Sequence, residues 1–197
     1  MGQRLNLEIR KKNKVLANAY YHWSGYTESS AELANICINA LLDNEDSCYK
    51  LKAVRALEAT GAGMNPEELE YMKNYSKYSD LDFKPCKDRN AGIIAVSPKG
   101  IKDTQLWMEG YVTIDITNLD DIRINSDVWG FYESEDDYID CCSLEAEDEI
   151  KEFKDSIFEV SYDPCNLSVS QYNDIIDILK DDNIVKFPDG TLISNFC

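Results

Sequence analysis

The hydrophobic pattern changes its period within the first 42 residues, and this change limits the fold more than any other feature of the chain. Leu5, Leu7 and Ile9 alternate with polar residues, which is the pattern of a half-buried strand. Val15–Trp23 returns after a polar turn as a second strand rich in aromatic residues, so we expect a β-hairpin. Over residues 30–42 the apolar residues recur at helical spacing instead. A chain that combines strands and helices in this order favours the α+β class.

We expect three helices after the hairpin. Ser29 and Glu32 form a capping box at the start of the first, and Ser47 is placed to cap the second. Asn65 followed by proline begins the third, because asparagine is a good N-cap and proline is tolerated in the first helical turn. The polar segment 77–90 is then predicted to be a loop or an internal joint.

Strands are expected again beyond this segment. Gly92–Val96 has the composition of a short buried strand, and Pro98–Gly100 is predicted to form a turn. Tyr111–Thr117, Ile122–Asn125 and Val128–Glu133 follow as the strands of an antiparallel meander.

The C-terminal part is expected to combine helices with a last hairpin. Ile150, Phe153 and Ile157 make the buried face of an acidic helix, and Tyr172–Leu179 that of a later one. The chain would end in a hairpin across Pro188–Gly190. The predicted fold is therefore α+β, with an N-terminal β-hairpin, a helical segment, an antiparallel meander, and C-terminal helices and hairpin.

Charge divides the chain into two unlike halves. Residues 1–102 hold 15 lysines and arginines against 13 aspartates and glutamates, whereas residues 103–197 hold 5 against 24. The formal net charge of -17 therefore comes from the second half. Together with the predicted loop, this asymmetry suggests a near-neutral part over 1–84 and an acidic part over 85–197, or else a single domain over 1–197.

Composition disfavours several classes of protein. A net charge of -17 repels a phosphate backbone, so direct nucleic-acid binding is not expected. No uncharged run approaches the roughly 20 apolar residues that cross a bilayer, and the chain opens directly on a strand pattern. Seven cysteines without a C-x-x-C motif favour reduced thiols. We therefore expect a cytoplasmic protein without a membrane partner.

His22 is the one histidine and the one candidate for a histidine general base. On a strand, Tyr20, His22 and Ser24 would point to the same side, so a serine–histidine pair can be considered. No G-x-S-x-G nucleophile elbow accompanies it, and a hydrogen-bonded structural or interface histidine is the alternative. We predict no catalytic residue, and a non-enzymatic role is favoured while an enzymatic one stays open.

Neither a metal nor a cofactor is predicted. Asp115–Asp127 supplies oxygen ligands but lacks the alternating ligands, central glycine and final glutamate of an EF-hand. Gly61–Gly63 lacks the lysine and the serine or threonine of a P-loop, and we interpret it as a helix stop.

Aromatic residues gather from Tyr20 to Tyr26. Half of the rings on such a hairpin would face the core and half would face outward, where tyrosine and tryptophan often anchor protein interfaces. Tyr20 and Trp23 are therefore candidate partner-binding residues, and packing of both faces into the core is the alternative.

The densest acidic stretch, Glu133–Asp155, supplies the other candidate partner-binding residues. Carboxylates over Glu145–Glu149 would lie in the first turn of the predicted helix, where they stabilise the positive end of its dipole. The upstream carboxylates crowd like charges at a cost in stability, which a basic partner would explain. A solvated surface is the alternative. The candidates are Glu133, Glu135, Asp136, Asp137, Asp140, Glu145, Glu147 and Asp148.

Three stretches of the sequence, Met1–Glu8, Leu16–Thr27 and Ala91–Val96 followed by Gly100, resemble uncharacterised proteins carried by phages and mobile elements of Gram-positive bacteria. Phage-borne proteins of this size include anti-CRISPR and other anti-defence inhibitors, some of which are acidic and occupy the nucleic-acid channel of a nuclease. The resemblance implies action in the cytosol of a bacterial host. It supplies no site residues.

Charge and resemblance lead to one hypothesis with two alternatives. The chain is predicted to be a non-enzymatic phage-type inhibitor that binds a basic nucleic-acid-binding protein, such as a CRISPR nuclease, through an acidic surface. The first alternative is a phage-encoded enzyme that acts through His22 or a carboxylate pair. The second is a structural or regulatory phage protein.

Overall fold

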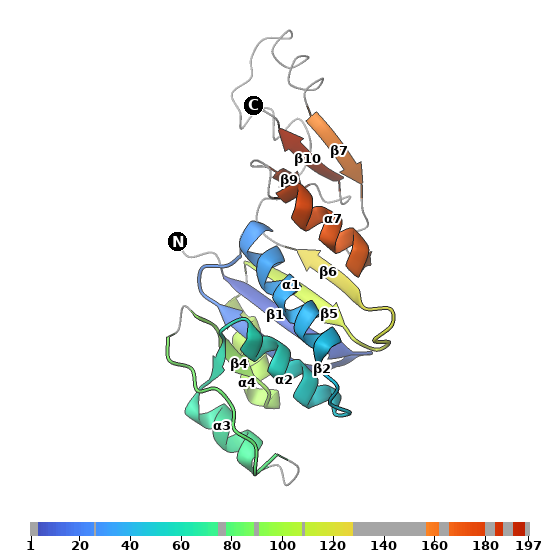
Figure 1. Ribbon diagram of the computed structural model, residues 1–197. Helices are drawn as coiled ribbons and strands as arrows, with labels where there is room; N and C mark the ends of the chain where they lie inside the picture. The colour runs from blue at the N-terminus through green and yellow to red at the C-terminus, as the bar shows by residue number, and fades with distance from the viewer. Residues whose placement is uncertain are drawn as a thin grey trace.

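Two β-sheets and the helices that cover the larger one make up the computed structural model (Figure 1). It describes residues 4–25, 27–74, 78–88, 91–107, 109–127, 157–161, 166–179, 184–186 and 191–195. The larger sheet is mixed and has the strand order β3-β4-β2-β1-β5-β6-β8. The smaller has the order β7-β10-β9. The α+β class predicted from the sequence is confirmed.

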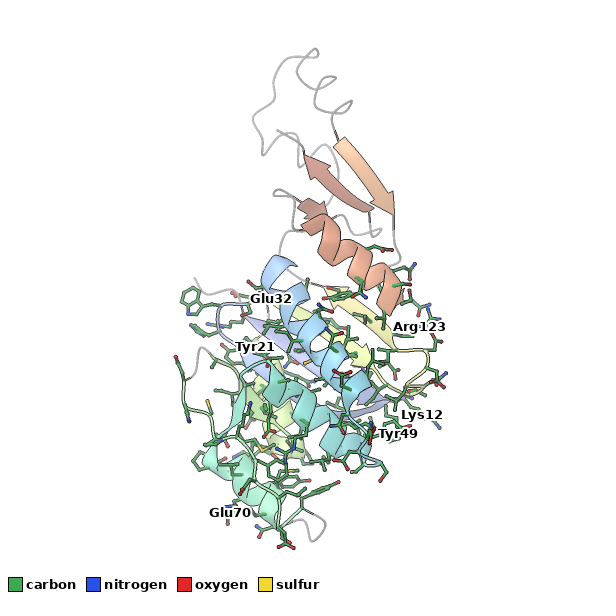
Figure 2. The ribbon with its side chains drawn as sticks, in the orientation of Figure 1. Lys12, Tyr21, Glu32, Tyr49, Glu70 and Arg123 are labelled. Atoms are coloured by element: carbon green, nitrogen blue, oxygen red, sulfur yellow. The ribbon has the colours of Figure 1, made fainter. Side chains whose placement is uncertain are left out.

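The predicted N-terminal hairpin lies at the centre of the larger sheet. Strands β1 (Leu5–Lys11) and β2 (Lys14–Tyr21) pair antiparallel, with Leu7 opposite Ala19. Their turn, which contains Lys12, lies beside Tyr49 at the start of α2 (Figure 2). Nζ of the preceding Lys11 is 3.1 Å from the centroid of the Tyr49 ring. The switch from alternating to helical periodicity thus predicted the order of these elements correctly.

Both parts of the chain that the charge asymmetry suggested, 1–84 and 85–197, contribute strands to this sheet. β3 (Gly63–Met64) pairs parallel with β4 (Ile93–Ala95), and β4 pairs antiparallel with β2. On the other side of the hairpin, β5 (Gly110–Asp115) runs parallel to β1. The two parts suggested by charge are therefore connected by strand pairing within one sheet.

The predicted meander is present in its first two strands. β5 pairs antiparallel with β6 (Arg123–Asp127), and β6 pairs in turn with β8 (Leu167–Ser168). The strand predicted over Val128–Glu133 lies outside the described residues. The neighbour of β6 thus comes from a segment about 40 residues further along the chain, a long-range pairing that turn signals alone do not reveal.

The helices follow the predicted order, with corrections at their starts. α1 (Thr27–Asp43) begins before Ser29, so the predicted capping box lies inside the helix. α2 (Tyr49–Ala59) has Cys48 rather than Ser47 at its N-cap position. α3 (Pro66–Lys73) confirms the predicted cap, since the Asn65 side chain accepts a hydrogen bond of 2.9 Å from the Glu68 N–H.

One predicted turn is the beginning of a helix. α4 (Pro98–Thr104) starts at Ser97, whose hydroxyl accepts the Gly100 N–H at 2.9 Å, and a 3₁₀ turn, η2 (Gln105–Trp107), continues it. The prediction of a turn at Pro98–Gly100 is wrong because serine followed by proline is also a helix start, with proline in the first turn.

The C-terminal elements are partly as predicted. α7 (Val169–Leu179) agrees with the later helix, and β9 (Ile184–Lys186) pairs antiparallel with β10 (Thr191–Asn195) as the terminal hairpin. Ile157, assigned to an acidic helix, instead begins β7 (Ile157–Ser161), which pairs with β10. Pairing with a distant strand overrides the local helical spacing there. Residues 150–156 lie outside the described part.

The larger sheet is covered on both faces. α1 and α2 cross one face in front of the strands in Figure 1, over the fully buried Leu5, Leu7 and Ile9. α4 lies on the opposite face, where Asn6 and Glu8 are also buried. The predicted half-buried strand is therefore wrong in one respect, because α4 and η2 cover its polar side as well. Within the described residues, the helices lack the length and hydrophobicity needed to span a membrane.

Candidate functional site

The aromatic residues at the end of β2 divide between the core and the surface. Tyr21 is buried, whereas the Trp23 residue is 51% exposed. The Tyr20 hydroxyl lies 3.0 Å from Nδ1 of His22, and the His22 and Trp23 rings meet edge-on at 5.0 Å. Tyr20 and His22 thus share a side, as predicted, and Tyr26 lies outside the described part.

A cavity of about 400 Å³, which we call the α4 cavity, opens on the same face of the sheet. Tyr20 on β2 pairs with Ile93 on β4, and both contribute to its lining together with Ala95, two residues further along β4. Helix α3 contributes Tyr71, and α4 contributes Asp103. Its volume is within the range of small-molecule and side-chain pockets.

Glu68 fixes the wall of this cavity. Its Oε2 accepts the backbone N–H groups of Val96 at 2.7 Å and Ser97 at 2.8 Å, and its Oε1 accepts the Ser97 hydroxyl at 2.5 Å. The Glu68 residue is only 4% exposed. It therefore ties α3 to the start of α4, so that both helices hold fixed positions around the cavity.

Lys50 lies behind the same wall. Its Nζ donates to the Val96 carbonyl at 3.4 Å and lies 5.3 Å from the centroid of the Tyr71 ring. Burial, with a smaller contribution from Lys14, lowers the pKa of Lys50, while the Glu68 carboxylate acts in the opposite direction.

A second cavity, of about 790 Å³, adjoins the first and shares Tyr20, Asn65 and Ile93 with it. His22 and Cys86 both line this second cavity. The Cys86 thiol donates to the carbonyls of Asp88 and Gly92, at 3.4 and 3.7 Å. A histidine and a thiol in one cavity are the components of nucleophilic catalysis, although the thiol is directed toward these carbonyls.

Polar side chains form a buried layer between the sheet and α4. Asn18 accepts the Thr104 hydroxyl at 3.1 Å, and Glu8 accepts the Gln105 side chain at 2.9 Å and Nε of Arg10 at 2.8 Å. This layer was not predicted from the sequence. Its signal was the placement of asparagine and glutamate at alternate positions of two neighbouring strands, which point to the same face when the strands pair.

The predicted acidic candidates lie outside the described residues, but the points where their segment joins the sheet are described. The chain leaves the sheet after Asp127, at the end of β6, and returns in β8, where Leu167 pairs with Ile124. These strands are at the edge opposite β3 and β4. The acidic segment therefore follows a strand on one side of the central hairpin, whereas the α4 cavity lies against β2 and β4. The eight candidates concerned are Glu133, Glu135, Asp136, Asp137, Asp140, Glu145, Glu147 and Asp148.

The described cysteines, Cys37, Cys48 and Cys86, are all free thiols in unlike surroundings. Burial raises the pKa of the Cys37 thiol strongly. Partial burial also raises the pKa of Cys48, but hydrogen bonds from the Tyr78 hydroxyl, 2.8 Å away, and from backbone N–H groups outweigh it and give a net lowering. Across the part of the chain that the structure describes, His, Cys, Asp and Glu side chains form no group able to hold a metal ion.

Comparison with protein-family models, curated proteins and solved structures finds no match to this chain. The function is therefore inferred from its residues and their arrangement.

Proposed function

We propose that this chain is a non-enzymatic inhibitor that binds a basic nucleic-acid-binding protein through its acidic part. The observation that carries the proposal is the division of charge, with 24 acidic and 5 basic residues in 103–197 against 13 and 15 in 1–102. An excess confined to one part of a chain is typical of a specialised surface rather than of general solubility.

The topology of the sheet supports the proposal. Glu133–Asp155 falls in a single excursion of the chain, which begins after β6 and ends at β8. Neighbouring strands at the edge of the larger sheet are the two ends of that excursion, and β7 within it, which follows the acidic stretch, pairs with β10 in the smaller sheet. A loop or insertion supported by a rigid sheet is a common location for binding residues.

Inhibition would follow from competition for a basic channel. Carboxylates would occupy the positions of nucleic-acid phosphates, and the opposite charges would accelerate association of the two proteins. An RNA-guided CRISPR nuclease is the partner class that we favour, and the site of action would be the cytoplasm of a bacterial host.

The test is neutralisation of the upstream carboxylates to Gln or Asn, with binding to an RNA-guided nuclease measured at about 50 mM and about 200 mM salt. We expect affinity to fall about tenfold or more at the lower salt, and the salt dependence to flatten, because screened attraction between the proteins is lost. The residues to change together are Glu133, Glu135, Asp136, Asp137 and Asp140.

A matched control removes the same amount of charge elsewhere. Five exposed carboxylates of the first half serve for this, and their neutralisation should leave the affinity within about twofold. Equal losses in both variants would indicate a general effect of net charge, and an unchanged salt dependence in the test variant would refute the proposal. The control residues are Asp43, Glu45, Asp46, Glu70 and Asp82.

A second candidate function is favoured by the cavity that His22 and Cys86 share. An enzyme that used His22 as a general base would lose about 10²- to 10⁴-fold activity in the His22→Gln variant. The inhibitor, in contrast, would keep its stoichiometric effect on the nuclease. A large loss of inhibition in a folded His22→Gln variant, together with turnover by the wild-type chain, would favour the enzyme.

A further inference from the structure

The α4 cavity combines aromatic rings with carboxylates. Tyr20 and Tyr71 are partly exposed and line it from β2 and α3. Three carboxylates, from Glu67, Glu68 and Asp103, line it together with one ammonium group, that of Lys99. Aromatic faces and carboxylates both attract cations, so this lining favours a positively charged occupant.

Asp103 is the carboxylate most available to a ligand. It is exposed, and its side chain has no ion-pair partner among the residues that the structure describes. Glu67 faces Lys99 at 4.0 Å, and both side chains are about four-fifths exposed, at 80% and 78%. Such a pair is weak, and a better-placed cation can replace its lysine.

Glu68 adds negative charge beneath the cavity. Its oxygens accept hydrogen bonds from uncharged donors at the start of α4, and these bonds leave the negative charge in place. Lys50 also interacts with the Glu68 charge, but it lies outside the lining of the cavity and donates to the Val96 carbonyl. The potential at the base of the cavity is therefore favourable to a cation that enters from the partner.

We propose that the α4 cavity binds an arginine side chain of the basic partner. A guanidinium group is planar and can stack on tyrosine rings while its N–H groups donate to a carboxylate such as Asp103. Arginine and tyrosine are also the residue types that most often dominate binding energy at interfaces. The proposal rests on the proposed function only in that the partner is a basic protein.

The cavity would be a second contact, separate from the acidic stretch. It lies against β2 and β4, whereas the acidic stretch follows β6, on the other side of the central hairpin, and precedes β7 of the smaller sheet. Two contacts on one rigid scaffold bind more tightly than either alone when the partner can reach both.

The test uses a probe that needs no partner protein. N-acetylarginine amide is titrated into the full-length chain and followed by NMR, with N-acetylcitrulline amide as a neutral ligand of nearly the same shape. We expect shifts in the signals of Tyr20, Tyr71 and Ala95, and an affinity for the arginine probe about fivefold or more above that for citrulline.

Asp103→Asn should reduce the affinity for the arginine probe about fivefold, because the charge-assisted hydrogen bonds are lost. Asp120→Asn removes the same charge from the exposed loop between β5 and β6 and should change the affinity less than twofold. Equal affinities for the two probes, an unaffected Asp103→Asn variant, or shifts confined to another surface would each overturn the proposal. Preference for the neutral probe would indicate a small uncharged ligand and would also overturn it.

Failure of this proposal can be distinguished from failure of the proposed function. The variant with five neutralised acidic residues should bind the arginine probe as the wild type does, yet bind the nuclease weakly. If Asp103→Asn leaves probe binding unchanged while that variant loses the nuclease, only the cavity proposal fails. If probe binding depends on Asp103 while the acidic variant keeps the nuclease at both salt concentrations, only the proposed function fails.

Discussion

The two faces of the larger sheet are both buried, but different interactions stabilise them. On the side of α1 and α2, Leu5, Leu7 and Ile9 pack against an apolar cluster that includes Ile38 and Leu57. On the side of α4, buried Asn6, Glu8 and Asn18 form hydrogen bonds to α4, to η2 or to a neighbouring arginine. One pair of strands therefore supports a nonspecific apolar core and a specific polar layer.

This difference decides where a binding site can form. Apolar side chains pack closely and leave little space, whereas polar partners must keep fixed distances and directions. The α4 cavity lies on the polar face, bordered by Thr104 of that layer and by the Glu68 contact. A rigid polar layer can hold side chains in fixed positions around a cavity, as a binding site requires.

The largest effect is expected from truncation on the apolar face. Leu7→Ala removes a fully buried side chain and should lower the free energy of unfolding by about 2–5 kcal/mol, through lost burial and the cavity left behind. Leu106→Ala, on the exposed side of η2 where 63% of the residue is accessible, should change it by less than about 0.5 kcal/mol. Urea unfolding measures both, and similar losses would contradict the assignment of the core.

On the polar face, the corresponding experiment changes hydrogen bonding without changing size. Glu68→Gln replaces one acceptor oxygen by a donor that faces N–H or hydroxyl groups of Val96 and Ser97, and should cost about 2 kcal/mol. Its exposed neighbour provides the control, since Glu67→Gln should cost less than about 0.5 kcal/mol. Equal stability of the two variants would show that Glu68 does not tie α3 to α4.

The apolar face could be predicted from the sequence better than the polar one. The alternation of Leu5, Leu7 and Ile9 indicated a buried side, and the hairpin to β2 needed only a short turn. The N-cap of α3 and the terminal hairpin are equally local, and both were predicted. Burial of Asn6 and Glu8 depends on α4, which lies about 90 residues further along the chain. The alternation indicates that these polar side chains share a face, but no local pattern indicates that α4 covers it.

The candidate site was predictable only in part for the same reason. Tyr20 was identified because it belongs to a dense aromatic run. Tyr71 and Asp103 belong to no motif, and only the pairing of β2 with β4 and the position of α4 bring all three to one cavity. Charge asymmetry, in contrast, is a property of composition, so the sequence alone revealed the acidic segment.

An effect of intermediate size is expected from Cys37 and Cys48, which should change how the free energy of unfolding depends on pH. Burial holds the folded-state pKa of Cys37 above its ordinary value of 9.0. The neutral thiol therefore makes its full contribution to the free energy of unfolding below about pH 9, and this contribution is lost as the pH rises further. The loss should approach about 1.4 kcal/mol per pH unit and be smaller in Cys37→Ala, where the buried Tyr21 and Tyr172, whose pKa values burial also raises, still contribute near pH 10. Urea unfolding between about pH 8 and about pH 10.5 measures it.

The contribution of Cys48 to stability should depend on pH in the opposite direction. Its folded-state pKa lies below the ordinary 9.0, so its contribution is present above that pH and is lost as the pH falls through the lowered value. In the wild type, Cys48 therefore makes the free energy of unfolding rise with pH, and Cys48→Ala should abolish this rise. Cys37 makes the free energy of unfolding fall with pH, and Cys37→Ala should reduce this fall. Cys48 should also react faster than Cys37 with iodoacetamide in the folded chain, because the thiolate is the nucleophile. The reverse order of reactivity would show that the surroundings of the two thiols are assigned wrongly.

The smallest effect on the free energy of unfolding is expected from two buried tyrosines, whose hydroxyl groups lie on the otherwise apolar face. The Tyr21 hydroxyl lies 2.6 Å from Oγ1 of Thr60, whereas the buried Tyr172 hydroxyl has no hydrogen-bond partner within the described residues. Tyr21→Phe should therefore lower the free energy of unfolding by about 1 kcal/mol, because the Thr60 hydroxyl loses one of its two hydrogen bonds and keeps only the one to the Leu57 carbonyl. Tyr172→Phe should leave it unchanged or raise it by up to about 1 kcal/mol, since the cost of burying an unpaired hydroxyl disappears.

The two substitutions remove the same atom from the same side of the sheet, so thermal unfolding of the two variants separates the effect of hydrogen bonding from the effect of side-chain size. A loss of stability in Tyr172→Phe equal to that in Tyr21→Phe would mean that the Tyr172 hydroxyl is paired after all, and that this face relies on polar contacts as the α4 face does.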